Sequence, residues 1–186
     1  MNSLKRWGVV ASAASIGALG VIAVGAVASA NSGTNNQPFT VTERLSGYHE
    51  NPLALSTTGS GSVRLTVDPA AKTLTYTLRY ANLAGTVTQA HIHFGSPSQV
   101  GGVSVFLCSN LGNGPAGTPT CPTTNPGVVT RTVTAAEVIG PASQGIAPGE
   151  FAGLVKAIRA DSTYANVHSD KYPIGEIRSQ LTPHDH

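Results

Sequence analysis

Two histidines spaced two residues apart are the side chains of this 186-residue chain that most clearly suggest chemistry. They lie in the stretch QAHIHFG, residues 89–95. Because side chains alternate between the two faces of a β-strand, His91 and His93 would share one face, and Ala90 and Ile92 the other. We predict a strand with one buried face and one wetter face that carries both imidazoles.

A pair of imidazoles on one strand becomes a metal site when tertiary packing brings a third imidazole to it. The third candidate is His168, in the short alternating segment YANVH at residues 164–168. Three neutral imidazoles suit copper or zinc and leave a coordination position open for water or another ligand. We therefore expect a transition-metal site formed by His91, His93 and His168, with copper favoured. In the alternative interpretation, the three histidines are structural and bond to neighbouring strands.

Three further polar residues are candidates for the same binding face. Asn166 alternates in phase with His168, and Glu176 and Arg178 are two residues apart in the last alternating segment. Asn166 or Glu176 could orient an imidazole through its second ring nitrogen. Glu176 and Arg178 are expected to form an exposed pair worth less than about 1 kcal/mol. Arg178 is alternatively available to hold an anion or the carboxylate of a partner.

Two other histidine-containing segments have simpler interpretations. His49 and Glu50 are adjacent in a loop and are expected to be a solvated pair, although either could donate to a metal. The tail carries His184 and His186, which could bind copper or zinc weakly. We expect this tail, residues 183–186, to be frayed.

Short alternating segments separated by turn signals must position these residues. We expect strands over 39–45, 63–67, 74–80, 87–94, 103–107, 128–133, 164–168 and 175–181. The second and third form a hairpin, and so do the last two. A helix is expected over Glu150–Ala160, where apolar residues fall at i, i+3, i+4 and i+7. This pattern predicts a mainly β chain, an antiparallel β-sandwich with one amphipathic helix.

The first 30 residues predict a secretory signal. Lys5 and Arg6 precede an uncharged stretch over residues 7–27, and small residues follow at 28–30. We expect cleavage before Asn31 and a location outside the cytoplasm, in the periplasm, at the cell surface or in the medium. An uncleaved anchor is the alternative interpretation. We expect no membrane span after cleavage.

The rest of the chain divides into a disordered leader over residues 31–38 and one domain over residues 39–182. Lys5 and Arg6 are among the 11 basic residues, and the others balance the nine Asp and Glu residues. This balance gives no reason to expect nucleic acid or an anionic membrane as a partner. The chain has no Gly-x-Ser-x-Gly elbow and no phosphate-binding glycine loop, so an enzyme is not favoured.

The two cysteines, Cys108 and Cys121, both fall in the part expected to be exported. An oxidising compartment makes a disulfide the expected state. The ring it closes would stabilise the fold by about 3 kcal/mol on a chain-entropy estimate. The alternative is a pair of thiolate metal ligands, although this spacing is not typical of zinc sites.

Two longer segments resemble the signature blocks of the CHRD domain, a family named from the extracellular chordin proteins and common in secreted bacterial proteins. The first block is AHIHFG at 90–95 followed by GGVSVFL at 101–107, and the second is YANVHS at 164–169 with PIGEIRSQL at 173–181. LSG at 45–47 and ENP at 50–52 are similar to the opening of the domain. The resemblance extends from about Thr40 to Leu181.

The resemblance implies an extracellular β-sandwich module, associated in chordin with growth-factor partners. It maps the histidine positions of the family onto His91, His93 and His168. The insertion after Cys108 departs from the family, so partner specificity is expected to differ there. The His-x-His pattern also resembles copper/zinc superoxide dismutase, without its bridging histidine and aspartate. We therefore expect a secreted metal-binding protein; the alternatives are a metal-free module with a protein partner, or a copper redox enzyme of dismutase type.

Overall fold

The computed structural model describes residues 36–183, so the predicted signal segment and most of the predicted leader and tail lie outside the described residues. Eight strands form one antiparallel sheet in the order β5-β4-β7-β8-β1-β2-β3-β6. The strands are β1 (Phe39–Ser46), β2 (Ser60–Asp68), β3 (Thr73–Ala81), β4 (Val87–Phe94), β5 (Gly102–Ser109), β6 (Gly127–Thr134), β7 (Thr163–Ser169) and β8 (Ile177–Gln180). Every strand predicted from the sequence is present.

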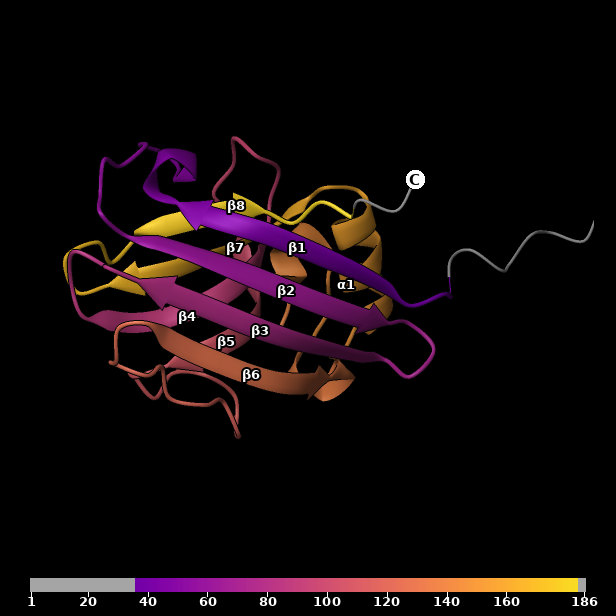
Figure 1. Ribbon diagram of the computed structural model, residues 1–186. Helices are drawn as coiled ribbons and strands as arrows, with labels where there is room; N and C mark the ends of the chain where they lie inside the picture. Colours follow the sequence, from indigo (N-terminus) through magenta and orange to yellow (C-terminus); the bar gives the residue numbers. More distant parts are fainter. Residues whose placement is uncertain (1–35, 184–186) are drawn as a thin grey trace, which may run out of the picture. The chain divides into compact units, whose positions relative to one another are not determined.

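The sheet folds into two layers at the junction of β1 and β8, where Ser46 and Arg178 are the paired residues. Figure 1 shows β1, β2, β3 and β6 in one layer and β4, β5, β7 and β8 in the other. Alternate side chains of the strands fill the space between the layers, and the fully buried ones include Val63, Leu65, Leu78 and Ile92. The predicted antiparallel β-sandwich is confirmed.

The α-helix α1 (Phe151–Arg159) lies in the sequence between β6, which belongs to one layer, and β7, which belongs to the other. Its apolar stripe of Phe151, Leu154, Val155 and Ile158 is buried, as the 3.6-residue period predicts. Short 3-10 turns flank other strands at Gly47–His49, Ala135–Glu137 and Ala142–Gln144. No helix within residues 36–183 is long and apolar enough to cross a membrane.

The two cysteines form the predicted disulfide, and their Cα atoms are 5.0 Å apart. Cys108 lies near the end of β5, and the disulfide anchors the loop between β5 and β6 to that strand. Both residues are buried in the core. The alternative of two thiolate metal ligands is therefore excluded.

Strand β4 is the element that organises the candidate site. It pairs with β5 on one side and with β7 on the other. On β7, Asn166 lies opposite His91, Tyr164 opposite His93, and His168 opposite Gln89. Side chains of directly opposed residues share a face, so this register brings His168 on β7 to the same face as His91 and His93 on β4.

Candidate metal centre

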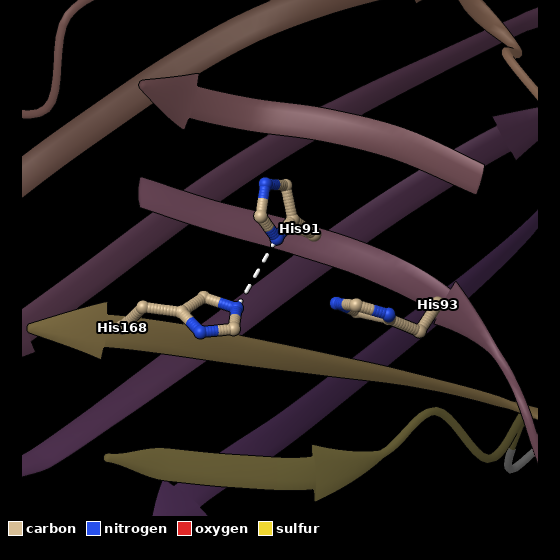
Figure 2. Close-up of side chains that lie close together, drawn as sticks. All are labelled: His91, His93 and His168. Carbon is tan, nitrogen blue, oxygen red and sulfur yellow. Dashed lines mark hydrogen bonds between the residues drawn. The ribbon is translucent and has the colours of Figure 1, made fainter. Parts of the chain in front are cut away.

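The three histidines converge on one space between adjacent strands. Figure 2 shows His91 and His93 on β4 and His168 on β7, with their rings turned toward each other. The Nδ1 atom of His91 is 3.2 Å from the Nε2 atom of His168. One ring nitrogen from each of the three lies within 4.8 Å of the others. The structure thus places the three predicted ligand residues in one cluster.

Backbone carbonyls fix the tautomers of two of the rings. The Nδ1–H group of His93 donates to the carbonyl oxygen of Gly101 at 2.9 Å, and that of His168 donates to Pro173 at 3.0 Å. A carbonyl oxygen can only accept, so in the neutral ring the Nε2 atom carries a lone pair. The Nε2 atom of His168 therefore accepts a hydrogen bond from the Nδ1–H group of His91, whereas the Nε2 atom of His93 has no partner in the described part of the chain. An outer ring nitrogen held by a backbone carbonyl is usual for a metal-binding histidine.

Burial keeps the cluster uncharged. His91, His93 and His168 are 2%, 8% and 5% exposed. The pKa of His91 is lowered to about 2, mainly by desolvation and to a smaller extent by the neighbouring His168 and His93. Desolvation likewise lowers the pKa of His93 to about 4 and lowers that of His168. Near neutral pH the three rings are therefore neutral, and an ion bound at the Nδ1 atom of His91 would replace the proton that this atom donates to His168.

The burial of these rings corrects one prediction. The sequence pattern predicts a wetter face for His91 and His93, whereas both faces of β4 are covered. Register shifts in the β4–β5 pairing place Phe106 opposite His91, and their rings meet edge to face at 4.4 Å. The ring of Tyr164 stacks on that of His93, with the ring centroids 4.8 Å apart and an angle of 3° between the ring planes.

Arg178 is buried beside the site. The prediction that it forms an exposed pair with Glu176 is therefore wrong. Its Cζ atom lies 3.4 Å from the centroid of the Tyr164 ring, on which it stacks. Its guanidinium donates to the carbonyl oxygens of Gln99, Ser96 and Pro97 at 3.0, 3.1 and 3.3 Å. Arg178 therefore holds the loop between β4 and β5 and is 2% exposed.

Glu176 takes part in a different network, so its predicted role beside the histidines is also corrected. Its carboxylate accepts hydrogen bonds from Thr57, from the backbone of Ala84 and from Ser169. Ser169 follows His168 on β7 and therefore points to the opposite face. Glu176 joins segments at one end of the sandwich and does not orient an imidazole.

Asn166 lies on the histidine face, as its alternation with His168 predicts. It is 3% exposed, and its Oδ1 atom has no hydrogen-bond partner in the described part of the chain. Its side chain slightly raises the pKa of His93, against the larger effect of burial. The amide is therefore close enough to influence the cluster.

Glu50 is a residue that sequence reasoning missed. The interpretation as a solvated loop pair fits exposed His49 but is wrong for Glu50, which is 6% exposed. Desolvation raises the pKa of Glu50 to about 7, although Arg178 acts in the opposite direction. A Cβ atom at Gly175 would lie 2.7 Å from the carboxylate oxygens of Glu50. The resemblance of ENP at 50–52 to the opening of the CHRD domain was the available signal.

The residues present fit a bound transition metal. Ligand atoms about 2.0–2.1 Å from a tetrahedral ion are about 3.3 Å apart. The hydrogen-bonded nitrogens of His91 and His168 are 3.2 Å apart, and all three ligand nitrogens lie within 4.8 Å of one another, so the rings would close further around an ion. The Nε2 atom of His93 is buried without a hydrogen-bond partner among residues 36–183, as is that of His91. A buried polar atom without a partner costs about 1–3 kcal/mol, and an ion at the cluster would satisfy His93.

The fold and the site together define an antiparallel β-sandwich module with a buried three-histidine cluster. The model of the CHRD domain matches residues 41–181, which include all three histidines, and the chain belongs to the CHRD domain family. The resemblance seen in the sequence is confirmed. No curated protein and no solved structure matches the chain.

Proposed function

We propose that this CHRD-domain protein works outside the cytoplasm and binds one transition-metal ion, copper or zinc, through His91, His93 and His168. The observation that carries the proposal is the cluster of three neutral ring nitrogens within 4.8 Å. The disulfide and the predicted signal segment support an extracytoplasmic location. Family membership agrees with an extracellular module.

The chain's own residues supply binding and preorganisation. Gly101 and Pro173 hold the rings of His93 and His168 through backbone carbonyls, so their ligand nitrogens are oriented before an ion arrives. When bound, the ion would crosslink β4 to β7. An ion that binds the folded chain alone, at about 1,000 times its Kd, would stabilise the fold by about 4 kcal/mol.

Metal analysis and titration of the purified protein test this function. The wild-type protein is expected to bind one ion per chain, and the His91→Ala/His93→Ala variant to lose that binding. His49→Ala removes an exposed histidine and is the matched control, which should bind as the wild type does. Equal and weak uptake by all three proteins would overturn the proposal. A superoxide assay on the loaded protein separates a binding protein from an enzyme of dismutase type.

A metal-free interaction module is the second candidate function. The backbone hydrogen bonds of His93 and His168 favour it, because structural histidines make the same contacts. Leu53 and Ile174 are 73% and 68% exposed and line one hollow of about 180 Å³, which provides apolar surface for a protein partner. In this case chelators and added metal would leave the melting temperature unchanged.

A further inference from the structure

The candidate ligands carry no negative charge. Among residues 36–183 the cluster contains three histidines and neither a carboxylate nor a thiolate. Both cysteines are held in the disulfide. A bound ion would therefore keep its whole charge in a buried place. Because the cost of burying an ion rises with the square of its charge, a divalent ion costs about four times as much as a monovalent ion of equal radius.

The surroundings add a positive charge rather than a negative one. Arg178 lies on one face of Tyr164, at 3.4 Å, and His93 stacks with the same ring at 4.8 Å. A guanidinium is always protonated, and its repulsion of a cation doubles when the cation is divalent. Glu50 is the carboxyl group that interacts with Arg178. Even when Glu50 is ionised, it balances Arg178 and leaves the charge of the ion uncompensated.

The burial of the cluster also limits the coordination number. None of the three rings is more than 8% exposed, and the buried Nε2 atom of His93 faces no solvent. Phe106 covers His91, and the loop that Arg178 anchors bonds to His93 through Gly101. Zinc almost always takes four ligands in proteins. Cu(I) accepts three, and a closed set of three imidazoles suits it.

We propose that the three-histidine site selects Cu(I) over Zn(II) and Cu(II). This inference rests on the metal-binding function proposed above and specifies the charge of the ion. The three features that carry it are the neutral ligand set, the positive charge of Arg178 behind Tyr164, and the exclusion of solvent from the ring nitrogens. The site is thus a binding site for reduced copper rather than for a divalent metal ion.

Competition titrations with the purified protein test the selectivity. Cu(I) is supplied anaerobically in ascorbate with bicinchoninate as the competing chelator, and Zn(II) and Cu(II) are titrated against chelators of their own. The expected result is one Cu(I) per chain with an affinity at least 100-fold higher than that for either divalent ion. If a divalent ion binds as tightly through the same histidines, the inference is overturned and the proposed function stands. If no ion binds, both fail.

An added negative charge beside the cluster tests the electrostatic explanation of the selectivity for Cu(I). Asn166→Asp is nearly isosteric and places a carboxylate opposite His91 on β7. We expect the ratio of Cu(I) to Zn(II) affinity to fall at least tenfold. Asn125→Asp makes the same change at an exposed position before β6 and should leave the ratio unchanged. An unchanged ratio in Asn166→Asp contradicts the inference; the wild-type competition decides it if this variant does not fold.

Discussion

Replacement of Arg178 by methionine should destabilise the protein severely. Methionine keeps an unbranched apolar stem but removes donors to the carbonyl groups of Gln99, Ser96 and Pro97. Hydrogen bonds from a charged group are worth about 1.5–3 kcal/mol each, and stacking on Tyr164 adds about 1–2 kcal/mol. These contributions are not additive. We therefore expect the free energy of unfolding to fall by about 3–5 kcal/mol, the usual cost of breaking a buried charged network.

Chemical denaturation followed by circular dichroism measures this loss, and Arg178→Lys is the matched variant. Lysine keeps the charge but lacks the planar fork that reaches several carbonyls, so it should recover only part of the stability. Glu50→Gln in the Arg178→Met background should restore some stability, because it removes the carboxyl that Arg178 offsets. A loss below about 1 kcal/mol for Arg178→Met would refute the assignment of Arg178 as the anchor of the loop.

Three further predictions concern the stability of the metal-free protein. The pKa of His91 is lowered to about 2 and that of His93 to about 4, so the unfolded chain binds more protons below the ordinary value of 6.5. The free energy of unfolding should therefore fall as the pH drops from about 6.5 to 4, and denaturant titrations at several pH values check this. Gly175→Ala introduces a Cβ atom at a φ of 145°, 2.7 Å from neighbouring side-chain atoms, and should lower the melting temperature through a cost of about 1–3 kcal/mol. Cys108→Ser/Cys121→Ser should cost about 3 kcal/mol in denaturation and leave metal affinity unchanged.

The strands and the helix could be predicted because their signals are local. Val63, Leu65 and Val67 alternate in sequence and are all buried in the structure. The sequence signals for the apolar stripe of α1 and for the shared face of His91 and His93 are equally local. Pairing of β4 with β7, which brings His168 to that face, is a long-range contact that alternation within either segment does not specify.

The covering of the histidine face could not be predicted from alternation. A strand pattern gives the side on which a residue lies, but not what packs above it. The loop over His93 is held by Arg178, about 80 residues further along the chain, and such a contact leaves no periodic signal. Glu50 was missed for the same reason, because its carboxylate is buried beside Gly175, which lies in a distant segment of the sequence.

The most direct test of the three-histidine site is a crystal structure of the metal-loaded protein with anomalous diffraction at the absorption edge of the ion. The expected result is one strong peak between the Nδ1 atom of His91 and the Nε2 atoms of His93 and His168. A peak elsewhere, such as at the tail histidines His184 and His186, would contradict the account. So would a loaded crystal without any peak at the cluster.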